Sequence, residues 1–267
     1  MIKKIKYIFV LLLVSTNLFS QVNDIDSLLK ELNDLQIKRL RNMSTDSRDS
    51  LFTEFDSYFL NLLKNEEFCM YKIDTSNHFI LNSNSLKNDS SITLVYALIN
   101  KVLYTTSKDN KIRIFSYDNL DGGPWHTYQS FLQFETHNNQ CKFHVLDTLS
   151  TDDMEVGYYK IHKLKSKDKS YYLLFGFGTQ GSGFHHRIIK ILKVENHDVS
   201  ECFECYPDGK KIIILSNRSQ EIGLNYDEFA NEITFKEFKS DEMIEPWFSD
   251  DFEIITYTFE NNKLIKK

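Results

Sequence analysis

Proline and long apolar runs are scarce in this chain, and no basic run occurs after its first twenty residues. Only 3 of the 267 residues are proline, which excludes a proline-rich linker. The apolar run at residues 8–14 is too short to span a bilayer, and no second stretch extends it. Acidic residues outnumber basic ones by 38 to 32, and no run of lysine or arginine after the predicted signal peptide offsets them. This composition argues against nucleic acid and anionic membranes as partners.

Cysteine is sparse as well, and none of the four cysteines lies near the N-terminus. No cysteine follows the apolar run, so an N-terminal lipid anchor is not expected. Residues 199–206 are predicted to form a strand, in which three residue steps span about 10 Å and point to opposite faces. A disulfide needs Cα atoms within about 7 Å of each other. We therefore predict no Cys202–Cys205 disulfide, and any bridge should join one of these two to Cys69 or Cys141.

The first twenty residues have the layout of a secretory signal peptide. Lys3, Lys4 and Lys6 form a basic start, residues 8–14 are apolar, and residues 15–20 are mostly small and polar. We expect this segment to be cleaved, so that the mature chain begins at or near Gln21. The protein is then exported to the periplasm, the cell surface or the medium, and no transmembrane segment remains.

Two amphipathic helices are predicted next. Apolar residues recur at three- and four-residue steps from Ile25 to Leu40, and again from Leu51 to Leu63. Polar residues that can cap a helix separate the two stretches. The predicted organisation is a signal peptide at 1–20, a helical hairpin at 21–66 and a β domain at 67–267.

The β domain is predicted to be mainly antiparallel. Aromatic residues make up 14 % of the chain, which suits strands, and no helical stretch is long enough for a series of crossovers. Residues 92–103 are apolar all round and fit either a strand or a buried helix. The predicted fold class is α+β, with the helical hairpin packed on a β-meander that forms a sandwich or a curled sheet; a propeller-like arrangement stays open. The expected strands are 111–117, 126–135, 142–147, 156–165, 170–175, 187–195, 199–206, 211–216, 232–238 and 252–260.

Two motifs that could hold a cofactor or a metal lack the context they need. Residues 176–181 match G-x-G-x-x-G, but a β-branched run follows where a dinucleotide site needs a helix, so a glycine-rich hairpin loop is predicted. His185 and His186 are adjacent on a strand and should point to opposite faces. His137 and His144 flank a turn, but no third ligand joins them. We predict no cofactor, no metal and no catalytic set.

The most unusual segment lies at residues 118–126, where carboxylates, a Gly-Gly-Pro sequence, Trp125 and His126 occur together. In an up-and-down meander, the loops at 118–125, 148–155 and 177–185 fall at one end of the sheet. Loops held on a rigid scaffold often carry function, so we predict a binding surface there. This loop rim comprises Asp118, Asp121, Trp125, His126, Asp152, Asp153, Gln180, His185 and His186.

The segment from Thr106 to Asp118, the Gly122-Gly123 pair and the run at 169–174 together resemble uncharacterised exported bacterial proteins. Those proteins look similarly built, with a signal, a helical segment and a Gly-Gly hairpin loop in a β-rich domain. The resemblance covers roughly residues 105–260 and implies export and a β-rich fold, but no activity.

The function predicted from the sequence is a non-enzymatic binding or envelope-associated role. The ligand or partner is a small molecule, a glycan or a protein, and the residues do not distinguish these. The alternative is an extracytoplasmic hydrolase that acts on glycans or similar substrates. Two carboxylates facing each other across a pocket at about 5–10 Å would favour that alternative.

Overall fold

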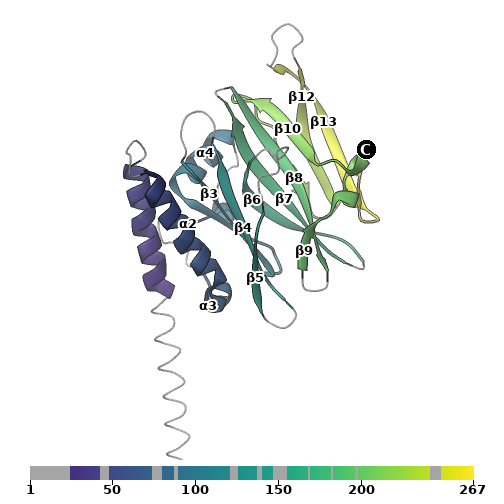
Figure 1. The fold of residues 1–267 in the computed structure, drawn as a ribbon. Helices are drawn as coiled ribbons and strands as arrows, with labels where there is room; N and C mark the ends of the chain where they lie inside the picture. Colours follow the sequence, from purple (N-terminus) through teal and green to yellow (C-terminus); the bar gives the residue numbers. More distant parts are fainter. Residues whose placement is uncertain are drawn as a thin grey trace, which may run out of the picture. The chain divides into compact units, whose positions relative to one another are not determined.

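The computed structural model describes residues 25–42, 48–73, 80–86, 90–120, 126–136, 140–146, 155–167, 169–181, 183–195, 198–240 and 248–267. The predicted signal peptide and His137 lie outside these residues, as do four members of the loop rim: Asp121, Trp125, Asp152 and Asp153. The chain divides into two compact units, Met1–Ile73 and Asp74–Lys267. The predicted fold class is confirmed, because the protein is α+β and mostly antiparallel β (Figure 1).

The first unit is helical. A helix over residues 25–41 is followed by α2 (Arg48–Lys64) and by the short α3 (Glu66–Met70). Arg39 is fully buried, with its guanidinium 4.1 Å from the ring centroid of Phe55, and it donates a hydrogen bond to Gln36. A new helix starts after Lys64 because the Asn65 side chain accepts a hydrogen bond from the backbone N–H of Glu67.

The second unit contains three open sheets rather than one continuous meander. The order in the first sheet is β1-β2-β3-β4-β5, with β1 parallel to β2 and the other pairs antiparallel. Its strands are β1 (Ile80–Asn82), β2 (Val102–Thr106), β3 (Ile112–Asp118), β4 (Tyr128–Glu135) and β5 (Cys141–Val145). The ambiguous segment at 92–103 divides into a helix and a strand, because α4 (Ser91–Asn100) ends just before β2 begins.

The second sheet has the order β10-β8-β7-β6, and β9 pairs with the far part of β8. Its strands are β6 (Gly157–Leu164), β7 (Ser170–Gln180), β8 (Phe184–Glu195), β9 (Asp198–Glu201) and β10 (Ile212–Asn217). The third sheet has the order β11-β12-β13-β14. Its strands are β11 (Asn225–Asp227), β12 (Glu232–Ser240), β13 (Phe248–Glu260) and β14 (Lys263–Lys266).

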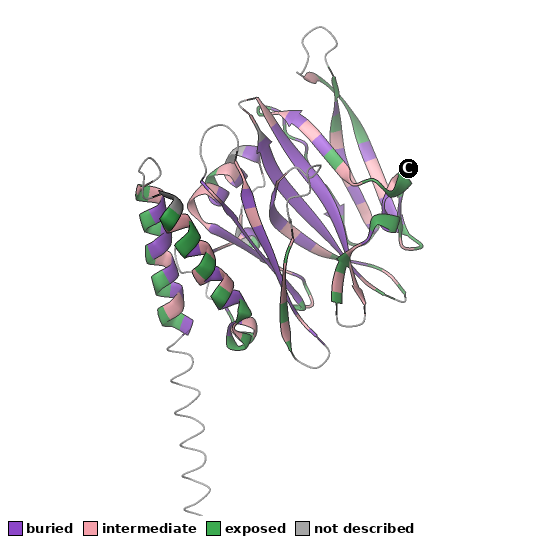
Figure 2. Ribbon diagram, in the orientation of Figure 1, coloured by how far each residue is buried: buried purple, intermediate pink, exposed green. Residues whose placement is uncertain are grey.

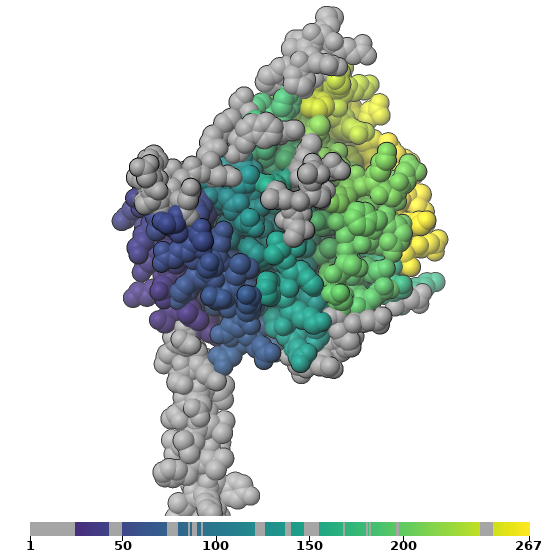
Figure 3. Space-filling model, in the orientation of Figure 1, coloured from purple at the N-terminus to yellow at the C-terminus, as the bar shows by residue number. Residues whose placement is uncertain are grey.

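The second sheet is the central layer of this unit. One face packs against the first sheet, through a cluster that includes Ile114, Leu132 and Leu174. The other face packs against α4 and the third sheet, through a larger cluster around Phe175. Because both faces are covered, β7 and β8 are buried along most of their length and do not alternate apolar with polar residues (Figure 2). The space-filling view in Figure 3 shows the residues of this unit in sequence order across the surface, from teal through green to yellow at the C-terminus.

The prediction for Cys202 and Cys205 is wrong. β9 ends at Glu201, and the chain then turns into the 3-10 helix η2 (Phe203–Cys205). This turn brings the two Cα atoms to 5.3 Å, and the sulfurs form a disulfide. A second short turn, η3 (Pro207–Gly209), leads into β10. The prediction failed because it extended a strand through residues that belong to a tight turn; no described cysteine is free.

The Asn231 side chain connects the third sheet to the second by hydrogen bonds. Its replacement should show how much these bonds contribute to the free energy of unfolding. Its side chain donates to the carbonyl of Phe259 at 2.5 Å and accepts from the Tyr226 hydroxyl at 2.6 Å. It also bonds both backbone groups of Lys165, at 3.3 Å each. Asn231→Gly keeps the backbone at its φ of 58° but removes these bonds. The free energy of unfolding in urea should fall by about 2 kcal/mol.

Asn261 supplies the matched control. It also has a positive φ, 50°, but it is exposed. Asn261→Gly should therefore leave the urea midpoint close to that of the parent protein. Equal losses for the two variants would mean that the effect comes from the backbone and not from the hydrogen bonds.

Candidate functional site

A fully buried carboxylate holds an imidazole at the end of β3. Asp118 is the last residue of that strand, and its Oδ2 lies 2.7 Å from Nδ1 of His126. The other oxygen, Oδ1, accepts the backbone N–H of Leu120 at 2.7 Å. The Asp118 side chain has no exposed surface, whereas the His126 side chain keeps 19 %. The pair is thus fixed from inside the protein and reaches the surface through His126.

Three polar side chains form a row across β7, β8 and β10. Strand register places Thr179 opposite His185, and His185 opposite Ser216, so all three share one face of the second sheet. All three are buried. Within the described part of the chain, neither Nδ1 of His185 nor Oγ of Ser216 has a hydrogen-bond partner. We call Thr179, His185 and Ser216 the polar row.

The polar row and the Asp118–His126 pair belong to one group. Tyr128, at the start of β4, lies beside Thr179, and burial together with the charge of Asp118 raises the pKa of its phenol. Burial, the nearby guanidinium of Arg218 and further neighbours that include His126 together lower the pKa of His185 to about 4. The His185 imidazole is therefore neutral at pH 7 and can both donate and accept a hydrogen bond.

His186 faces the opposite side of the sheet, as expected for adjacent residues on a strand. Its Nε2 lies 3.2 Å from the backbone carbonyl oxygen of Glu155, and burial lowers its pKa to about 4. Its register partner is Gly178, which leaves room for the ring. The structure thus brings Asp118, His126 and His185 together and separates His186 from them. Gln180 ends β7 next to this group, and only its backbone position is described.

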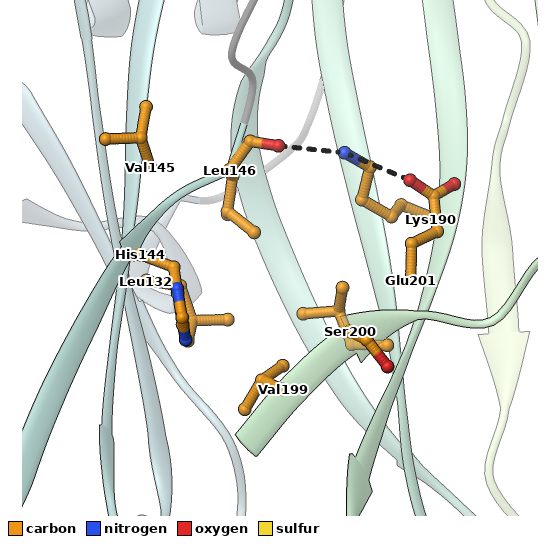
Figure 4. A pocket seen from close by; sticks show the side chains of 9 residues that line it. Leu132, His144, Val145, Leu146, Lys190, Val199, Ser200 and Glu201 are labelled. Atoms are coloured by element: carbon orange, nitrogen blue, oxygen red, sulfur yellow. Dashed lines mark hydrogen bonds and ion pairs between the residues drawn. The ribbon is translucent and has the colours of Figure 1, made fainter.

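A separate pocket of about 160 Å³ lies between the first and second sheets (Figure 4). One wall is formed by β4, β5 and the residue that follows β5, and the other by β8 and β9. The sequence did not point to this pocket, because its lining residues come from strands that are far apart in the chain. They are Leu132, His144, Val145, Leu146, Lys190, Leu192, Val199, Ser200 and Glu201.

Comparison with protein-family models, curated proteins and solved structures finds no match for this chain. The resemblance to exported bacterial proteins stays a prediction. No three histidine, cysteine or acidic side chains among the described residues converge in a way that could hold a metal ion. In the same residues, no helix has both the length and the apolar character needed to cross a membrane.

Proposed function

We propose that this is an exported, non-enzymatic binding protein whose ligand contacts the polar row beside the Asp118–His126 pair. The observation that carries the proposal is the pair of unpartnered buried atoms, Nδ1 of His185 and Oγ of Ser216. A buried polar atom without a partner costs about 1–3 kcal/mol, so such atoms are uncommon unless something binds them.

The ligand class that fits best is a neutral molecule rich in hydroxyl groups, such as a glycan end. The neighbouring groups are a neutral imidazole and hydroxyls, each of which donates and accepts. A sugar hydroxyl has the same two capacities and can satisfy both sides. The one carboxylate of this described group, Asp118, is already engaged with His126 and the backbone of Leu120.

Ser216→Ala separates a binding role from a structural one. Removing an unpartnered buried hydroxyl should leave the ligand-free protein as stable as before, or more stable by about 1 kcal/mol. The affinity for the bound sugar should nevertheless fall by about 10-fold. The measurement is a thermal-shift screen of mono- and disaccharides, followed by calorimetry with the strongest binder.

Thr258→Val is the matched control, because Thr258 in β13 also has a buried hydroxyl without a described partner. It should affect stability as Ser216→Ala does and leave the affinity unchanged. Binding that is equal in the parent protein and in Ser216→Ala would overturn the proposal, as would a screen in which no sugar raises the unfolding temperature.

One observation favours the alternative, an extracytoplasmic hydrolase. A buried aspartate oxygen 2.7 Å from Nδ1 of a histidine resembles the arrangement that orients a general base in hydrolases. A glycosidase would also need a second carboxylate. Turnover of chromogenic glycosides that falls at least about 100-fold in His126→Gln would establish this alternative. We expect no turnover by the parent protein.

Export is proposed from the N-terminal sequence, and intact mass tests it. Protein recovered from the periplasm or the medium should begin at or near Gln21, because residues 1–20 have the signal layout. A mass that still includes Met1 to Ser20 would contradict export by this route.

A further inference from the structure

The pocket between β5 and β8–β9 has an apolar body and a charged end. Five aliphatic side chains line it: Leu132, Val145, Leu146, Leu192 and Val199. At one end, the ammonium group of Lys190 lies between the Leu146 carbonyl oxygen, at 3.2 Å, and Oε2 of Glu201, at 3.6 Å (Figure 4). The Lys190 side chain is only 4 % exposed.

Two further residues besides Lys190 hold the Glu201 carboxylate in place. The Tyr206 hydroxyl donates to its Oε1 at 3.0 Å, and Lys211 lies 3.5 Å from its Oε2. Tyr206 is itself fixed, because its hydroxyl accepts the backbone N–H of Ile191 at 2.7 Å. The side chains at the charged end are therefore held in position before any ligand binds. The ammonium groups of Lys190 and Lys211 lie on the same carboxylate, that of Glu201.

We propose that this pocket binds a small aliphatic monocarboxylate, at a site separate from the polar row. The carboxylate of the ligand joins the Lys190 ammonium, and its chain lies against the aliphatic wall. An ammonium that binds a carboxylate in a largely desolvated place gains more than it does with a neutral oxygen. This combination of mostly apolar walls with a few placed polar groups is typical of small-molecule sites.

The size of the pocket limits the ligand. A dry engineered cavity of about 150 Å³ in another protein accommodates benzene, so a pocket of 160 Å³ suits a chain of about four to six carbons. A ligand with so few atoms binds weakly, and we expect a Kd on the order of 1 mM. Longer chains should bind less well because they exceed the volume.

The test is a calorimetric or NMR titration of the purified protein with pentanoate, 1-pentanol and pentylamine. Pentanoate should bind at about 1 mM, the alcohol at least about 10-fold more weakly, and the amine more weakly still. Pentanol that binds as tightly as pentanoate would overturn the carboxylate assignment. No binding of pentanoate at tens of millimolar would overturn the site itself.

Two variants and one control locate the binding. Lys190→Met should weaken pentanoate at least about 10-fold and leave it no better than the alcohol. Val199→Phe, which fills the pocket from β9, should abolish binding of both. Lys193→Met is the control, because Lys193 on the same strand pairs instead with Glu195 and Glu204. Unchanged pentanoate binding in folded Lys190→Met and Val199→Phe would contradict the proposal. Sugar binding by these variants should stay intact, which separates this result from any failure at the polar row.

Discussion

Gly178→Ala is expected to destabilise the protein by about 3 kcal/mol, the largest loss we predict for a single methyl group. A Cβ at this position would overlap Nε2 of His186 and would lie 2.5 Å from the backbone carbonyl oxygen of Glu155. These two groups also lie 3.2 Å from each other, in hydrogen-bond contact. The methyl group must therefore displace a buried ring and a stretch of backbone together. Urea unfolding measures the loss.

Gly223→Ala is the control for the loss of a glycine. No atom lies within 4 Å of a Cβ there, but φ is 64°, so only the left-handed backbone resists the side chain. That resistance costs about 1–2 kcal/mol. If Gly178→Ala lowers the free energy of unfolding no more than Gly223→Ala does, then His186 does not pack against β7 as described.

Acid should destabilise the protein between about pH 6.5 and pH 4, through two buried histidines and one that is half-buried. Burial lowers the pKa of His162, His185 and His186 from 6.5 to about 4 in each case. In this range the unfolded chain binds protons that the folded chain does not, so the free energy of unfolding decreases as the pH falls. For His162 and His186 the loss is about 3 kcal/mol each once the pH is below 4. Urea unfolding at a series of pH values measures it.

His162→Leu identifies one contributor. The His162 ring packs against Phe175 and Tyr226, at 5.4 and 5.0 Å between centroids, and leucine is of similar size. The variant should lose less stability than the parent protein over the same pH range. Asp109 acts in a different window, since its pKa is lowered to about 2 and its contribution is lost only below about pH 4. A stability that does not change from pH 6.5 to pH 4 would contradict the buried neutral histidines.

Most of the strands and the fold class could be predicted from the sequence. The alternation of apolar and polar residues and the turn residues that bound a strand lie close together in the chain. The same local patterns could not predict which strands pair with one another in a sheet. The continuous meander breaks after β5, since β6 pairs with β7 and packs on the first sheet instead of extending it. The first two sheets are nevertheless joined by a hydrogen bond, because the Oγ of Ser130 in β4 donates to the carbonyl oxygen of Val156 just before β6.

The candidate site was only partly visible in the sequence for the same reason. Asp118, His126 and His185 stood out as chemically capable residues next to glycine-rich loops. Ser216 and Thr179 did not, because their place depends on strand register between β7, β8 and β10. Tyr128 looked like an ordinary strand aromatic until its hydroxyl was found beside Thr179. The disulfide was missed because a three-residue turn replaces the expected strand.

The central claim is that a ligand completes the polar row, and nitrogen NMR of the histidine side chains tests it most directly. The Nδ1 resonance of His185 should shift when the strongest-binding sugar is added, because that atom gains a hydrogen-bond partner. The resonances of His162, which packs between Phe175 and Tyr226 instead, should not move. An unchanged His185 signal at saturating sugar would contradict the account.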